Sequence, residues 1–198
     1  MSILKFTRLL VGSVMLLVML SAHAQQAKKN EDLRKRFDIA VMYQAMRSNS
    51  VGGSGFWLQG ASGQLHAQLW HGLGGVAELS GMHNGNINSS GVGLDLFTLA
   101  FGPRYTWDRP HSRLSLYGQA LAGGAFGRSS LFPTSSGSAN AGARSLAFSL
   151  GGGVNYTLPH HLSLHAVQAD WMRTQLPNGI TNAQNNLRIG SGILLHFK

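Results

Sequence analysis

The sequence predicts an all-β fold: an eight-stranded antiparallel up-and-down transmembrane β-barrel that follows a cleaved signal peptide. Three observations lead to this prediction. Apolar and polar residues alternate with a period of two through eight successive segments. The connections between these segments are alternately long and short. Charged residues make up only 12% of the chain, whereas about 25% is usual for a soluble globular domain.

The first 24 residues have the three parts of a secretory signal peptide. Lys5 and Arg8 give a basic start, 9–20 is an apolar run, and an Ala-His-Ala sequence at 22–24 supplies small residues before a cleavage site. A membrane anchor is the alternative, but a helix over 9–20 extends only about 18 Å, against about 30 Å of hydrocarbon. We therefore expect a signal peptide at 1–24, a polar basic periplasmic arm at 25–36 and the barrel at 37–198.

The strands follow from the alternation, taken in chain order. In the first, FDIAVMYQ (37–44), large apolar residues fall on one side and smaller or polar residues on the other. The same pattern recurs in QLHAQL (64–69), AELSG (77–81), FTLAFGPRYTW (97–107), LSLYGQALAGGAF (114–126), LAFSLGGGVNY (146–156), LSLHAVQADWM (162–172) and LRIGSGILLHF (187–197). We expect long connections at 47–55, 82–91, 127–143 and 173–185, and short ones at 71–72, 108–112 and 157–161.

Three positions do not fit a regular ladder. Pro103 lacks a backbone donor, and we expect a bulge there. In the seventh strand the parity breaks near 166–167, which predicts a second bulge. Asp95 has outward parity, so we expect it to lie above the membrane or behind a change of register.

The apolar parity is expected to face lipid, because the other parity is small or polar but hardly charged. Aromatic residues cluster towards the two strand ends, as in the girdles of membrane barrels. The alternative is that they form the core of a soluble barrel. The expected membrane-interface residues are Phe37, Tyr43, Tyr105, Trp107, Tyr156, Trp171 and Phe197, with Phe56, Trp57, Phe97 and Phe126 added at the long-loop end.

The charged residues of the strands fall mainly on the lumen parity. Glu78, Arg104, Gln119 and Arg188 are expected to form a polar network with ion pairs, because burying unpaired charges is costly. A narrow barrel that contains such a network is usually closed to solutes. The same residues are therefore the expected plug.

A second inward group lies towards the short-turn end. Asp38, His66, His165 and His196 could meet there, and three imidazoles with a carboxylate could bind zinc or another transition metal. The favoured alternative is a hydrogen-bonded plug in which Asp38 orients the imidazoles. We expect no cofactor.

Residues for nucleophilic catalysis are few. Ser80, His83 and Glu78 are the candidates for nucleophile, base and acid, but Glu78 and Ser80 have lumen parity. We therefore expect no catalytic residues and no enzymatic activity.

Three segments in order resemble the outer-membrane β-barrel domain family, the small OmpA-like and OmpX-like eight-stranded barrels of Gram-negative envelopes. These are FGPRY at 101–105, AVQADW at 166–171 and the closing LRIGSGILLHF at 187–197. Within the last, Gly192, Leu195 and Phe197 match the ending that the family's barrel-assembly machinery reads. Lys198 after the aromatic and Gly190 in place of a polar residue depart from the family pattern.

The resemblance implies an integral protein of the outer membrane with periplasmic N- and C-termini. We expect a structural or surface-interaction role through four extracellular loops, with the lumen plugged. The alternatives are a small passive pore for ions or small solutes, a lipid-modifying outer-membrane enzyme, and a soluble secreted barrel. The expected partners are outer-membrane lipid and lipopolysaccharide, the barrel-assembly machinery during insertion, and an extracellular ligand of the loops. We expect no nucleic-acid partner, because the chain is exported.

Overall fold

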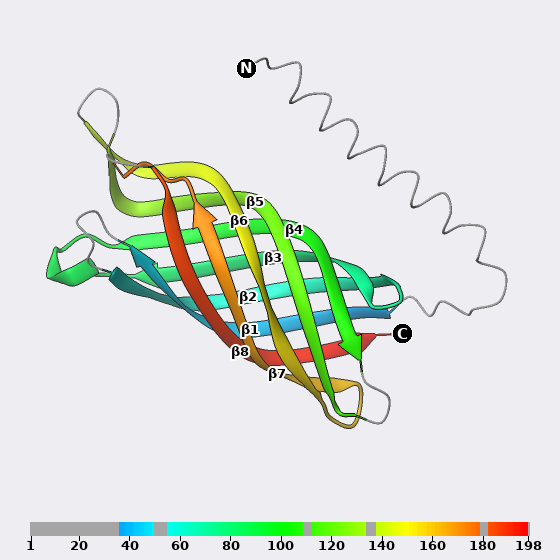
Figure 1. The fold of residues 1–198 in the computed structure, drawn as a ribbon. Helices are drawn as coiled ribbons and strands as arrows, with labels where there is room; N and C mark the ends of the chain where they lie inside the picture. Colours follow the sequence, from blue (N-terminus) through cyan, green and yellow to red (C-terminus); the bar gives the residue numbers. More distant parts are fainter. Residues whose placement is uncertain (1–35, 50–54, 109–111, 134–137, 179–181, 198) are drawn as a thin grey trace, which may run out of the picture. The chain divides into compact units, whose positions relative to one another are not determined.

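The computed structural model describes residues 36–49, 55–108, 112–133, 138–178 and 182–197 (Figure 1). Signal-peptide residues 1–24 and arm residues 25–35 lie outside the described residues. The described strands are β1 (Arg36–Asn49), β2 (Gly55–Trp70), β3 (Leu73–Asn84), β4 (Leu94–Asp108), β5 (Leu114–Pro133), β6 (Ala139–Thr157), β7 (Leu162–Thr174) and β8 (Gln184–Phe197). A short 3₁₀-helix, η1 (Ile87–Ser89), lies between β3 and β4.

The eight strands form a closed antiparallel barrel, in which each strand pairs with its sequence neighbours and β8 returns to β1 (Figure 1). The predicted all-β fold, an eight-stranded antiparallel up-and-down barrel, is therefore confirmed. Among the described residues, no helix is long and apolar enough to span a membrane. We call the end with the β2–β3, β4–β5 and β6–β7 connections the short-turn end, and the opposite end the loop end.

The alternation along each strand separates two faces. Large apolar side chains point outwards and are exposed; Phe101 is 67% and Leu79 61% accessible. The opposite parity is buried inside the barrel and holds Glu78, Arg104 and Arg188, each no more than 2% accessible. Closure of the sheet thus places these three charged side chains inside the barrel and most of the large apolar side chains outside.

The third long connection is mostly strand, which corrects the expected loop at 127–143. β5 continues to Pro133 and β6 starts at Ala139, with a register shift between Arg128 and Phe132. The serine- and glycine-rich composition predicts a loop, but backbone pairing does not depend on these side chains. Phe132 turns inwards at the end of the hairpin and is buried.

The two expected bulges have different outcomes. β7 does shift register at Ala166: Val154 pairs with Val167 and Asn155 with His165, which confirms that bulge. Pro103 does not create one. Its pairing with Gly75 continues the β3–β4 register, and β4 resumes pairing with β5 in the same register beyond it. The missing donor therefore interrupts the ladder without inserting a residue.

The seam that closes the barrel explains one residue of the C-terminal motif. Gly192 in β8 pairs with Met42 in β1. A Cβ atom at position 192 would clash with the carbonyl oxygen of Val41, which belongs to the backbone and cannot rotate away. Glycine is thus needed here for the close approach of the two strands.

Candidate functional site

Arg188 on β8 is the centre of a buried ion-pair cluster in the described lumen. Its guanidinium group lies 2.5 Å from Glu78 Oε1 on β3 and 2.8 Å from Asp170 Oδ2 on β7. All three side chains are no more than 2% accessible. One cation is thus held by two carboxylates from different sides of the barrel.

Arg104 on β4 supplies the second buried cation. It donates from Nε to Gln119 Oε1 at 3.1 Å and also to Gln64 Oε1. Its guanidinium carbon lies 4.2 Å from the centre of the Tyr117 ring. With Glu78 and Asp170 as the two acids and Arg104 and Arg188 as the two bases, the network has no net charge.

Two amides join the cations to the acids. Gln64 donates to Glu78 Oε2 at 2.5 Å and to Gln168 Oε1 at 3.1 Å. Gln168 in turn donates to Asp170 Oδ2 at 2.5 Å. The Tyr117 hydroxyl donates to Gln168 Oε1 at 2.7 Å. Side chains from most strands therefore meet across the lumen.

The network includes the four residues expected from the sequence. Glu78 and Arg188 are in direct contact, as are Arg104 and Gln119. Sequence reasoning left Asp170, Gln64, Gln168 and Tyr117 out of the network. The alternation pattern shows that these side chains point inwards. Which inward side chains lie at the same height along the barrel axis, however, depends on the stagger of the strands in the closed barrel.

A separate cluster occupies the short-turn end of the lumen. The Asp38 carboxylate lies 3.0 Å from His66 Nδ1 and 2.6 Å from His196 Nδ1, and the Ser163 hydroxyl lies 2.6 Å from His196 Nε2. These residues line a polar cavity of about 50 Å³. Asp38 thus holds two imidazoles by hydrogen bonds.

His165 does not join this cluster. Its Nε2 lies 2.7 Å from the Tyr117 hydroxyl and 3.1 Å from Gln168 Oε1, within the central network. The bulge at Ala166 is next to His165 and determines the position of this side chain along the barrel axis. Of the four candidate metal ligands, Asp38, His66 and His196 therefore meet, and His165 does not join them. The described residues contain no group of three or more metal-ligating side chains arranged to hold an ion.

Ser163, His196 and Asp38 follow the order of a nucleophile, a base and an orienting acid. Ser163 is only 1% accessible, however, and the adjoining cavity is about 50 Å³. The arrangement can fix imidazole orientation but gives a substrate little access. The catalytic candidates from the sequence are separated: Ser80 contacts Thr98, Glu78 pairs with Arg188, and His83 contacts Asp95.

An apolar layer fills the lumen at the loop end, and sequence reasoning missed it. Met46 and Leu58 are fully buried there, opposite each other on β1 and β2. Phe56 also belongs to this layer, so its assignment to the outer aromatic girdle was wrong. The other members are Met82, Leu94, Leu96, Ala125, Phe132, Ala147, Met172 and Leu176.

The seven aromatic residues expected at membrane interfaces all lie on the outward parity. Tyr43 is the most exposed, at 59%, and its hydroxyl donates to Gln59 Oε1 at 2.7 Å. Tyr105 and Trp107 pack edge to face at the short-turn end, with ring centres 4.6 Å apart. Asp95 has outward parity near the loop end of β4 and contacts His83 and Ser129.

The barrel resembles solved structures. Neisserial surface protein A superposes with a TM-score of 0.63 at 14% identity, covering 81% of this chain and 97% of that chain. Ail, the attachment invasion locus protein of Yersinia pestis, in complex with the heparin analogue sucrose octasulfate, gives 0.54 at 15% identity, covering 83% and 100%. This is the fold of the small eight-stranded outer-membrane barrels. By sequence, the chain matches no protein-family model and no curated protein.

Proposed function

We propose that this protein is an integral outer-membrane barrel without enzymatic activity, closed to solutes, which acts through the surface that its loop end presents outside the cell. One observation carries the proposal: the outer face exposes a broad band of apolar side chains, while Glu78, Asp170 and Arg188 are paired inside the barrel. A soluble protein would leave this large apolar surface in water. Lipid is the solvent that such a surface requires.

The route to the membrane is part of the proposal. Residues 1–24 would direct export, and the barrel-assembly machinery would read Gly192, Leu195 and Phe197. The termini would then be periplasmic and the loop end extracellular. We propose lipopolysaccharide as the surrounding lipid and an extracellular ligand for the loops.

The closed lumen is supported by two successive barriers. The central network joins side chains from most strands, and an apolar layer fills the lumen between this network and the loop end. We expect no steady single-channel openings after the full chain has inserted into a planar bilayer, with insertion shown by protease resistance. Steady openings would overturn the closed-lumen proposal and favour the passive pore.

An arginine placed on the outer face tests whether that face contacts lipid. Leu99 lies near the middle of β4, on the outward face of the strand, and is 52% accessible. We expect Leu99→Arg to lower the free energy of unfolding in lipid vesicles by about 2–4 kcal/mol, because the charge would enter hydrocarbon. Urea unfolding followed by tryptophan fluorescence measures the change.

Leu131 provides the matched control. It is 65% accessible and lies beyond Arg128 in the β5 extension. Leu131→Arg introduces the same side chain near or above the interface, where the cost falls to about 0–1 kcal/mol. Equal effects of the two substitutions would contradict a lipid-facing β4.

A further inference from the structure

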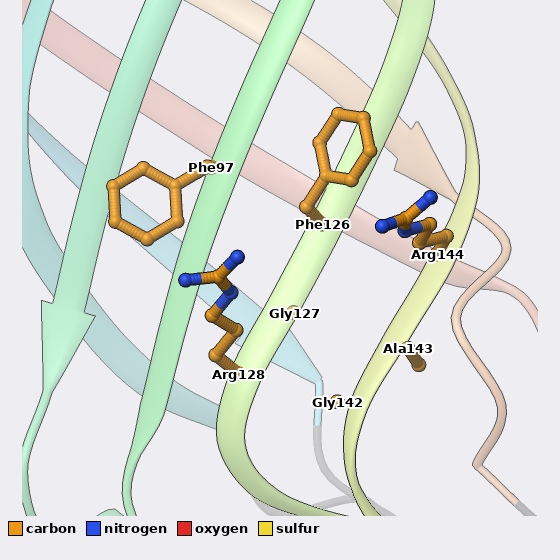
Figure 2. A pocket seen from close by; sticks show the side chains of 7 residues that line it. All are labelled: Phe97, Phe126, Gly127, Arg128, Gly142, Ala143 and Arg144. Carbon is orange, nitrogen blue, oxygen red and sulfur yellow. The ribbon is translucent and has the colours of Figure 1, made fainter.

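The outer face of the barrel has a hollow of about 660 Å³ near the loop end, over β4, β5 and β6. Figure 2 shows that the Arg128 and Arg144 side chains flank Phe126, with Phe97 on the neighbouring strand. The register explains the arrangement. Phe97, Phe126 and Arg144 are successive cross-strand partners, and Arg128 lies opposite Gly142, which has no side chain to fill the space.

Neither Arg128 nor Arg144 forms a salt bridge with a described residue. The guanidinium carbon of Arg144 lies 5.7 Å from the centre of the Phe126 ring. Asp95 lies across from Arg128 in the ladder. The Asp95 carboxylate accepts a hydrogen bond from Ser129 Oγ at 2.5 Å and lies 2.6 Å from His83 Nδ1, and its interaction with Arg128 is a weaker electrostatic one.

The hollow lies where the apolar outer face ends on the side of the loop end. From the short-turn end, the outward positions of β5 are apolar or small as far as Phe126, and Arg128 is the first charge. On β6 the outward positions are apolar or small up to Leu146, apart from the aromatic Tyr156, and Arg144 is again the first charge. In a membrane, such a boundary coincides with the level of the lipid headgroups.

We propose that this hollow binds the phosphate of an acylated, phosphorylated glycolipid of the surrounding leaflet. The two guanidinium groups provide paired donors with the geometry that phosphate accepts. Phe97 and Phe126 are 45% and 37% accessible and offer an apolar surface to the acyl chains. A free anion would match the arginines but not these two rings, so charge and apolar surface together specify a lipid.

This inference rests on the proposed function, because it requires the outer face to lie in a membrane. The probes are lipid A with both phosphates, the same lipid A with its phosphates removed, and inorganic phosphate. The full chain, refolded in detergent micelles, is mixed with each lipid, and retained lipid is counted by native mass spectrometry. Insertion into phosphatidylcholine vesicles is checked separately by protease resistance, so a failure to insert is distinguished from a failure to bind.

We expect the protein to retain phosphorylated lipid A about tenfold or more better than the dephosphorylated form, since charge-assisted hydrogen bonds are lost with the phosphates. The double variant Arg128→Gln/Arg144→Gln is expected to lose this preference. Arg47→Gln/Arg173→Gln is the matched control, because it removes two other exposed outward arginines at the same end. The control should retain the preference.

Four outcomes would overturn the inference. The Arg128→Gln/Arg144→Gln variant could keep the preference. The unaltered protein could show no preference for the phosphorylated lipid. The control could lose as much preference as the Arg128/Arg144 variant, which would indicate a diffuse charge effect. Finally, millimolar inorganic phosphate could displace the lipid completely, which would identify a site for the free anion instead.

Discussion

Replacement of Arg188 by methionine is expected to lower the free energy of unfolding by about 3–5 kcal/mol. The substitution removes the cation that lies 2.5 Å from Glu78 and 2.8 Å from Asp170. The buried carboxylates of Glu78 and Asp170 would then repel each other without the positive charge of Arg188 between them. Urea unfolding of the barrel in lipid vesicles, followed by tryptophan fluorescence, measures the loss.

A neutral variant separates the loss of pairing from the loss of packing. Arg188→Met combined with Glu78→Gln removes one cation and one acid together. Because Arg104 then balances Asp170 and the network again has no net charge, the combined variant is expected to recover most of the lost stability. If it is as unstable as Arg188→Met alone, the arginine acts through its contacts and not through its charge.

Truncation of Leu58 to alanine is expected to cost about 2–5 kcal/mol. Leu58 is fully buried in the apolar layer at the loop end, where Met46 lies opposite it. Neighbouring side chains come from several strands of a closed barrel and cannot collapse far into the space. The same urea titration measures the effect.

Leu79→Ala is the control, because it deletes the same atoms from the outer face. Leu79 is 61% accessible, and lipid chains can occupy the space that its side chain leaves. Its truncation is expected to cost clearly less than that of Leu58. Equal costs would mean that the apolar layer is loosely packed, and would remove one of the two barriers proposed to close the lumen.

Local sequence patterns identified the strands, since the side-chain direction along a strand repeats every two residues. The bulge at Ala166 was found in the same way, from the parity of Gln168 and Asp170. The alternation of apolar and polar residues does not reveal strands in segments that lack large apolar side chains. Serines and glycines at 127–143 were interpreted as a loop, yet their backbones pair between β5 and β6.

The sequence by itself determined the number and order of the strands, their outward and inward faces, and the inward placement of Glu78, Arg104 and Arg188. Only the tertiary structure decided which inward residues meet. His165 joins Tyr117 instead of Asp38, and Met46 and Leu58 build an apolar layer where a polar lumen was expected. The physical reason is that alternation specifies a side, whereas closure and stagger specify the level at which side chains from different strands touch.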